Sequence, residues 1–253
     1  KFLCQGVGGP RGFGALVDAT GRDLYRADGP QPSMYDTPGV HASFSQGIGF
    51  GFRQYAAGGI GLLSDLEGDD RYHAGEFAQG GAYYHALGVL HDGDGRDLYV
   101  ANRYGQGFGV HQAFGALVDG GGDDTYWSMT AASQGASWDL SAGLLLDRAG
   151  NDSYQADSLA QGAAANQAIA MLIDLEGDDR YAATGNAIQG QSGANTYHFI
   201  ASNAFSYSVL FDRAGRDWYS SGRPDGAITG TGAMDTADPK MSNVDGVVID
   251  LDE

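Results

Sequence analysis

One short pattern repeats almost from end to end of this sequence. It places Leu two residues before an Asp and follows that Asp with Gly-x-Asp-x-Tyr, and its clearest copy is Gly115–Tyr126. The first aspartates of the copies are Asp18, Asp65, Asp92, Asp119, Asp147, Asp174 and Asp212. Successive copies lie 27 or 28 residues apart in the centre of the chain and 38 or 47 apart toward its ends, so residues have been inserted there.

A fixed period of this length is typical of solenoids and propellers. A propeller blade needs about 40 residues, and the leucine-rich signature and sustained helical periodicity are both absent. Short alternating runs between Gly and Asp indicate strands and turns. We therefore predict an all-β fold, a right-handed parallel β-helix (β-solenoid) of about eight coils of roughly 27 residues, with three strands per coil. We expect a single domain over residues 1–253, with insertions near 28–40 and 190–207 and an irregular tail at 220–245.

Alternation along the strands predicts which side chains fill the core. The leucine two residues before each first Asp and the tyrosine seven residues after it, such as Leu117 and Tyr126, should form two inward columns. Gln-Gly pairs follow the same period and predict an inward amide ladder, in which each glutamine bonds to the next coil. These glutamines are Gln5, Gln46, Gln79, Gln106, Gln134, Gln161 and Gln189.

Small residues one and three positions after each Gln, such as Gly107 and Gly109, should then form a bare outward face. We expect the insertion at 28–40 and the tail to cover this face, or a homo-oligomer to form through it.

Composition limits the partners. The net charge of −18 argues against nucleic acid, and no stretch approaches the length of a membrane span. A single cysteine, Cys4, excludes an internal disulfide. We expect a bacterial protein that is secreted, periplasmic or part of the cell envelope.

The segments Gly121–Tyr126 and Ala149–Asp157 resemble the calcium-binding nonapeptide repeats of haemolysin-type (RTX) secreted bacterial proteins. The resemblance covers about eight residues per coil, and here the period is 27 rather than nine. It implies a parallel β-roll with Ca²⁺ between stacked copies. The implied metal ligands are Asp18, Asp23, Asp65, Asp70, Asp92, Asp97, Asp119, Asp124, Asp147, Asp152, Asp174, Asp179, Asp212 and Asp217.

The alternative to calcium needs no metal. Each Asp would accept backbone N–H groups of its own turn. Arginines beside the turns, such as Arg22, Arg180 and Arg216, would neutralise the carboxylates.

A polar and aromatic ridge is predicted five and six residues after the glutamines, and a second stripe after the tyrosines. Such groups resemble the sugar-binding clefts of β-helical polysaccharide lyases and hydrolases, although an ordinary solvated surface is the alternative. The catalytic candidates are His111, Asp139, Tyr84, His73, Glu76 and Arg103. The ligand-binding candidates are Tyr84, His85, His111, Trp138, Asp139, Asn166 and Trp127.

Two functions remain open. No signature of a known catalytic type is present, which favours a non-catalytic extracytoplasmic solenoid that binds a glycan or a protein surface, or spaces other domains, with calcium as a stabiliser. The alternative is a β-helical polysaccharide lyase or glycoside hydrolase, and whether the chain is an enzyme stays undecided.

Overall fold

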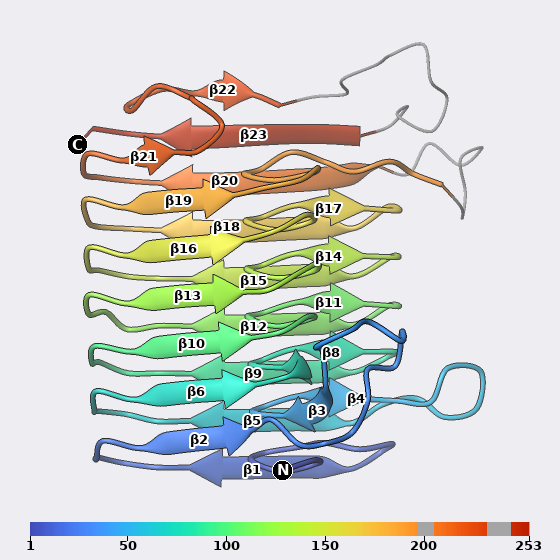
Figure 1. The fold of residues 1–253 in the computed structure, drawn as a ribbon. Helices are drawn as coiled ribbons and strands as arrows, with labels where there is room; N and C mark the ends of the chain where they lie inside the picture. The colour runs from blue at the N-terminus through green and yellow to red at the C-terminus, as the bar shows by residue number, and fades with distance from the viewer. Residues whose placement is uncertain (197–204, 232–243, 253) are drawn as a thin grey trace.

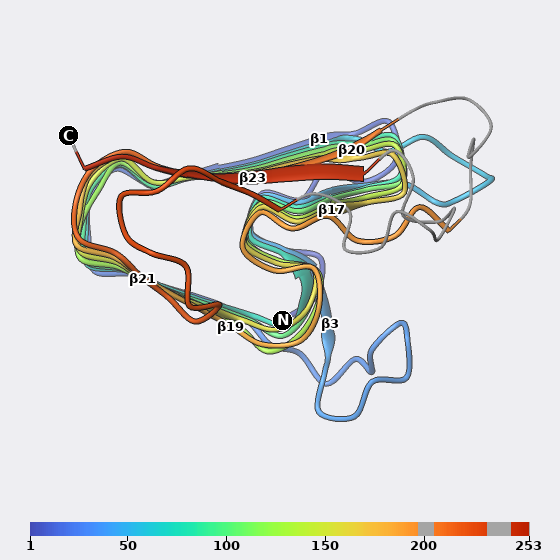
Figure 2. The same cartoon turned by 90° about the horizontal axis from the view of Figure 1, so that it is seen from above.

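The computed structural model describes residues 1–196, 205–231 and 244–252. These residues form strands and turns without a helix, and the strands stack in parallel (Figure 1). Seen from above, the chain runs counterclockwise as it rises from the N-terminal coil, which makes the winding right-handed (Figure 2). The predicted parallel β-solenoid is therefore confirmed. No helix of the described residues is long and apolar enough to cross a membrane.

Three stacked sheets and one strand pair make up the solenoid. The leucine sheet contains β1 (Phe13–Val17), β5 (Ile60–Ser64), β9 (Leu87–His91), β12 (Phe114–Val118), β15 (Ala142–Leu146), β18 (Ile169–Asp174), β20 (Ser206–Asp212), β23 (Val244–Asp250) and the antiparallel β22 (Thr229–Gly230). The tyrosine sheet contains β2 (Leu24–Ala27), β6 (Arg71–Ala74), β10 (Leu98–Ala101), β13 (Thr125–Ser128), β16 (Ser153–Ala156), β19 (Arg180–Ala183) and β21 (Trp218–Tyr219). The glycine sheet contains β4 (Gly49–Phe50), β8 (Ala82–Tyr83), β11 (Gly109–Val110), β14 (Ser137–Trp138) and β17 (Ala164–Ala165). The short strands β3 (Ala42–Ser45) and β7 (Glu76–Ala78) pair beside them.

The leucine and tyrosine columns form the main core, as predicted. Leu117 pairs in register with Leu90 and Leu145, and all three side chains are fully buried. Tyr99 and Tyr126 stack with ring centroids 4.8 Å apart and planes 3° from parallel. Each coil thus adds one leucine and one tyrosine ring to two continuous columns. These columns stay buried only if the strands of successive coils keep the same pairing register.

The glutamines point inward and bond to the next coil, as predicted, and their partners there are backbone carbonyls. The side-chain amide of Gln79 donates to the backbone carbonyls of Tyr72 and Val100, each at 3.0 Å. Tyr72 belongs to the same coil and Val100 to the next one. The glutamine column therefore joins successive coils through the backbone carbonyls of the tyrosine sheet.

The predicted bare outward face is also wrong, because the glycines face inward. Gln79 and Gly80 both have left-handed backbone angles, with φ of 55° and 72°. The chain bends sharply at these two residues, so the side chains do not continue to alternate between two faces as the prediction assumed. A Cβ on Gly109 would lie 2.0 Å from the carbonyl oxygen of Ala142 in the leucine sheet. Glycine is required here because the two sheets meet backbone to backbone. The leucine sheet covers the glycine face, which was predicted to be covered by the 28–40 insertion and the tail. The glycine face is therefore not a surface through which a homo-oligomer could form.

Side chains on the other side of the glycine sheet form a second apolar cluster. Its members include Phe77, Tyr104, Phe108 and Val110. The chain bends inward between β3/β7 and the glycine sheet (Figure 2), and this cluster fills the notch. The residues two before each Gln therefore line the notch rather than the main core.

Two loops of the first coils flank this notch. Residues 28–41 connect β2 to β3, and residues 51–59 connect β4 to β5. Parts of the other irregular regions predicted at 190–207 and 220–245, namely 197–204 and 232–243, lie outside the described residues.

Candidate functional site

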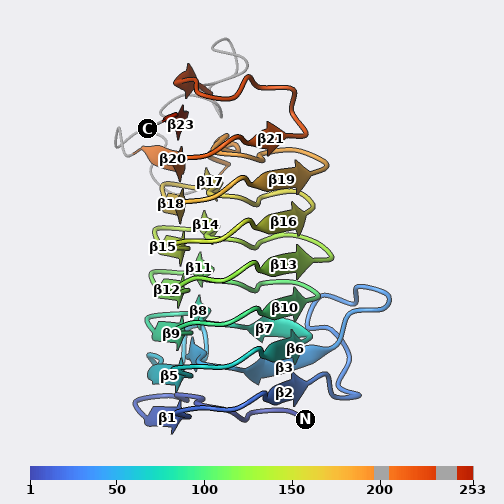
Figure 3. The ribbon, with the colours of Figure 1, turned by 90° about the vertical axis from the view of Figure 1, so that its left-hand side faces the viewer.

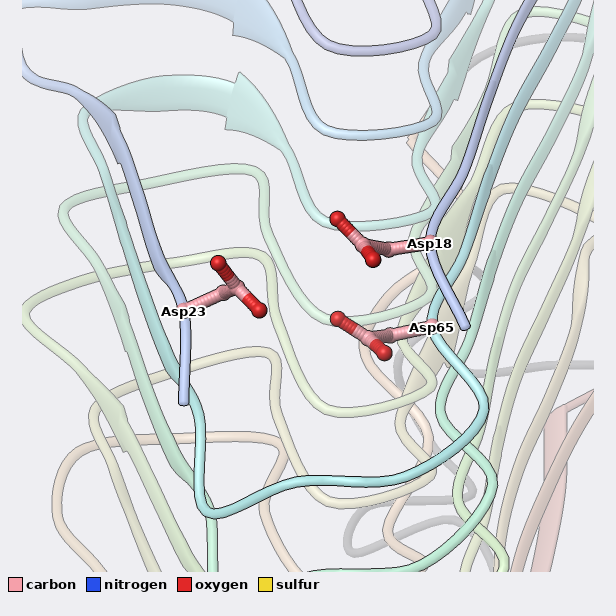
Figure 4. A group of neighbouring side chains, drawn as sticks. All are labelled: Asp18, Asp23 and Asp65. Carbon is pink, nitrogen blue, oxygen red and sulfur yellow. The ribbon is translucent and has the colours of Figure 1, made fainter. Parts of the chain in front are cut away.

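Two rows of aspartates line the corner at which the leucine sheet turns into the tyrosine sheet. Figure 3 looks onto these stacked turns. The first row follows the leucine strands: Asp18, Asp65, Asp92, Asp119, Asp147, Asp174, Asp212 and Asp250. The second row precedes the tyrosine strands: Asp23, Asp70, Asp97, Asp124, Asp152, Asp179 and Asp217. Together we call them the aspartate column. In Figure 4, Asp18 and Asp65 lie one above the other and Asp23 faces them.

First-row aspartates accept hydrogen bonds from the tyrosine column. The Tyr99 hydroxyl donates to Asp119 at 2.7 Å, and the Tyr126 hydroxyl donates to Asp147 at 2.6 Å, one coil further on. Burial and then the nearby Asp119 carboxylate raise the pKa of Tyr99 well above its ordinary value, so the hydroxyl stays protonated and donates. Asp119 also accepts the backbone N–H of Gly121 in its own turn, at 3.1 Å.

Second-row aspartates link one coil to the next. The N–H of Asp97 donates to Oδ1 of Asp124 at 2.6 Å, and the N–H of Asp124 donates to Oδ1 of Asp152 at 2.6 Å. The predicted bond to the N–H groups of the residue's own turn is therefore wrong for this row. Each of these carboxylates accepts a hydrogen bond from the backbone of the preceding coil. Neighbouring second-row carboxylates are therefore held one coil spacing apart.

The second oxygen of most second-row aspartates has no hydrogen-bond partner in the part of the chain that the structure describes. Among the described residues, Oδ2 of each second-row aspartate from Asp70 to Asp217 is buried without a hydrogen bond. Second-row and first-row aspartates form groups of three, in which one carboxylate oxygen of each residue lies within 4.8 Å of those of the other two. Five such triads are Asp18–Asp23–Asp65, Asp70–Asp92–Asp97, Asp97–Asp119–Asp124, Asp124–Asp147–Asp152 and Asp152–Asp174–Asp179. The four triads from Asp70 to Asp179 each share a second-row aspartate with the next, so these groups form a continuous column.

Burial of so many carboxyls makes their ionisation costly. Two unit charges about 4.8 Å apart repel by roughly 3 to 4 kcal/mol at an effective dielectric of about 20. Burial, followed by the charge of neighbouring first-row aspartates, raises the pKa of Asp97 to about 8, of Asp124 to about 9 and of Asp152 to about 11. The column therefore has to hold either protons or cations near neutral pH.

The arginines beside the turns do not neutralise the column. Arg22 pairs with Asp69 at 2.9 Å and Arg216 pairs with Asp178 at 2.9 Å, and both partners are outside the two rows. Arg180 lies over the Trp218 ring, 3.8 Å from its centroid. The predicted neutralisation by arginine is wrong for these residues, because their side chains leave the turns on the solvent side.

The predicted ridge exists as a stack, but most of it is buried. Tyr84, His111, Asp139 and Asn166 begin successive turns of two left-handed residues each. His111 is 9% exposed, Asp139 4% and Asn166 2%. His111 Nδ1 and Asp139 Oδ2 share a hydrogen bond, and Asn166 accepts one from the N–H of Thr196 at 2.7 Å. The side chains of His111, Asp139 and Asn166 were expected at the surface. The left-handed turns between the glycine sheet and the leucine sheet bury them instead.

The other ligand-binding candidates do not meet at one site. Trp138 packs against the second apolar cluster, and His85 lies exposed beside the Tyr84 ring, 4.5 Å between centroids. His73 and Trp127 lie on the tyrosine sheet and are separated by Val100. The two predicted stripes are therefore on different faces of the solenoid.

Glu76 and Arg103 fasten a loop to the solenoid. Glu76 is fully buried and accepts the backbone N–H of Met34 at 2.8 Å. Arg103 donates to the Thr37 hydroxyl at 2.9 Å and covers the Tyr35 ring at 4.4 Å. Burial raises the pKa of Glu76, and the Met34 N–H opposes this rise. Both residues were predicted as catalytic candidates. In the structure their side chains bind residues of the 28–41 loop.

Sequence reasoning missed a pocket at the N-terminal end of the notch. It has a volume of about 540 Å³ and is lined mainly by aromatic side chains, including Tyr35, Phe44, Phe52, Tyr55 and Phe77. A signal was present, since both insertions carry aromatic residues that the repeat does not require.

The chain matches no protein-family model, no curated protein and no solved structure in the comparisons made with it. Functional assignment therefore depends on the geometry of its own sites.

Proposed function

We propose that this chain is a non-catalytic β-solenoid module whose aspartate column binds a row of calcium ions. The observation that carries the proposal is the set of carboxylate triads, whose second-row members from Asp70 to Asp179 each have a buried Oδ2 atom without a hydrogen-bond partner among the described residues. Bound calcium would stabilise the stack of coils, so that the module can act as a spacer or present a binding surface.

The chemistry of the column favours calcium over magnesium. Calcium takes oxygen ligands at about 2.4 Å, so oxygens up to about 4.8 Å apart can share one ion, which is the spacing within a triad. Magnesium requires shorter, octahedral bonds and keeps several waters. A triad with buried oxygens offers little room for that water. The RTX-like turns of the sequence support the same ion.

Weak calcium sites of this kind suit a protein outside the cytoplasm. Extracellular calcium modules bind with dissociation constants of about 10⁻⁴ to 10⁻³ M. We therefore propose a secreted or periplasmic location, in agreement with the acidic composition.

Substitution by asparagine tests the proposal without removing the fold. In the triple variant D97N/D124N/D152N, each amide keeps an Oδ1 acceptor for the preceding N–H, and its NH₂ group can donate to a first-row carboxylate. We expect this variant to fold, and its Tm to rise on addition of 5 mM Ca²⁺ by less than about half as much as that of the wild type, because the Asp18–Asp23–Asp65 triad remains. The wild type should gain about 5 °C or more.

Asp123→Asn is the matched control, because Asp123 is adjacent to Asp124 but bonds to the exposed Asn151. It should keep the full calcium response. An unchanged calcium response in the triple variant, or none in the wild type, would sink the calcium proposal.

A polysaccharide lyase or hydrolase remains the second proposal, since His111 and Asp139 form a bonded acid–base pair. We expect a structural role for this pair. His111→Ala should lower the free energy of unfolding in urea by about 1 to 3 kcal/mol, because it leaves the buried Asp139 without this partner. The exposed His85→Ala should change it by less than about 0.5 kcal/mol. Turnover of any member of a polysaccharide panel that H111A abolishes without a loss of stability would favour the enzyme instead.

A further inference from the structure

The aromatic pocket in the notch is built by two separate insertions. Residues 28–41 form one wall and residues 51–59 the other, on opposite sides of the notch in Figure 2. The floor is Phe44, Phe50 and Phe77 of the second apolar cluster. A volume of about 540 Å³ lies in the range of small-molecule sites. Because both insertions depart from the repeat and meet at one place, the pocket is a feature added to the solenoid.

Buried charge holds one wall in place. The fully buried Glu76 accepts the N–H of Met34, and Arg103 covers the ring of Tyr35. The wall nevertheless leaves Met34 65% and Tyr35 44% exposed. Burial of a carboxylate is costly, and here it fixes a loop that presents apolar side chains to the pocket. The wall is therefore preformed for contact with an apolar group.

The opposite wall is a tight turn that also exposes aromatic rings. Backbone bonds between Phe52 and Ala56 close the turn, and Gln54 has a left-handed φ of 71°. The Phe52 ring packs edge-on against Phe50, with centroids 5.8 Å apart, while Tyr55 stays 89% exposed. Large exposed aromatic groups rimming a pocket are typical of binding sites.

One cation of this turn has no acidic partner. No hydrogen bond or ion pair joins Arg53 to another of the described residues, although the chain carries a net charge of −18. Its charge opposes the rise that burial causes in the pKa of Tyr83, which lines the same pocket. An unpaired guanidinium at the rim of an apolar pocket is complementary to a ligand that combines an apolar body with a negative charge.

We propose that this pocket binds a small amphipathic carboxylate, with its apolar or aromatic body between Tyr35, Phe52 and Phe77 and its carboxylate on Arg53. The two insertions and the second apolar cluster carry this site, and it is independent of the calcium column.

Fluorescence titration with parinaric acid tests the proposal, because this fatty acid gains emission in an apolar site. We expect saturable binding of one molecule per chain. Arg53→Gln should weaken binding of the acid by about fivefold and leave binding of its uncharged methyl ester unchanged. Phe52→Ala should weaken binding of both, since it removes part of the apolar wall.

Arg148→Gln is the matched control, because Arg148 is exposed and distant in sequence from both insertions, and it should bind the acid as the wild type does. The proposal is overturned if neither probe binds saturably. Equal affinity of the acid for the wild type and the Arg53 variant would overturn the role of the carboxylate.

Discussion

With calcium removed by a chelator, Tm is expected to fall by about 10 °C or more between pH 5 and pH 9. The second-row carboxyls from Asp70 to Asp217 have folded-state pKa values between about 6 for Asp70 and about 11 for Asp152, above the unfolded value of about 4. Above pH 4 the folded chain therefore holds protons that the unfolded chain has released. The stability from these protons is complete below pH 4 and is lost as the pH rises through the folded pKa values.

Calcium should reverse this loss, because it supplies the positive charge that the protons no longer provide. Addition of 5 mM Ca²⁺ should restore Tm at pH 9 and have little effect at pH 5, where protons occupy the column. Thermal melts followed by circular dichroism give Tm at pH 5 and at pH 9, each with and without calcium. The triple variant D97N/D124N/D152N is the control, and its Tm should depend less on both pH and calcium. A wild-type Tm that is the same in all four conditions contradicts the account.

Gly109→Ala is expected to destabilise the chain by about 3 kcal/mol or more. The added Cβ would lie 2.0 Å from the carbonyl oxygen of Ala142, and it could be accommodated only if the glycine and leucine sheets moved apart. Such a change corresponds to a fall in Tm of about 6 to 12 °C. If the glycines instead formed an outer face, the same substitution would stabilise the chain by about 0.4 to 1 kcal/mol through the unfolded state.

Gly230→Ala is the matched control for this substitution. Gly230 also lies in a strand, β22, and a Cβ there would have no heavy atom of the described residues within 4 Å. Its Tm should stay within about 2 °C of the wild type. Equal stability of G109A and G230A would contradict the close packing of the two sheets.

The sequence predicts the part of the fold that follows from strict repetition. Leu117 and Tyr126 recur at fixed distances from an Asp, and a column of such side chains can be buried only if coils stack in register. The same reasoning failed at Gln79 and Gly80. Alternation holds along an extended strand, and two left-handed residues in succession end it. The inward glycines and the outer notch could not be deduced without those backbone angles.

The candidate sites were predictable to different degrees. The aspartates of the column were identified from the repeat, but only the coordinates show that Oδ1 of Asp124 is bonded and Oδ2 is not. His111 and Asp139 were correctly placed one above the other, and their burial was missed because the turn directs them inward. The aromatic pocket is formed by two insertions that are not part of the repeat. The sequence pattern therefore could not predict that they lie side by side.

The number of calcium ions bound to the folded chain distinguishes an aspartate column that holds calcium from one that holds only protons. Equilibrium dialysis at pH 8, with the metal measured by mass spectrometry, gives this number for the wild type and for D97N/D124N/D152N. The described residues form seven groups of three or more metal-ligating side chains, of which the five named above are aspartate triads. Because neighbouring triads share an aspartate, the account predicts between about three and seven ions per wild-type chain and clearly fewer in the variant. A folded wild-type chain that binds no calcium at millimolar concentration would contradict it.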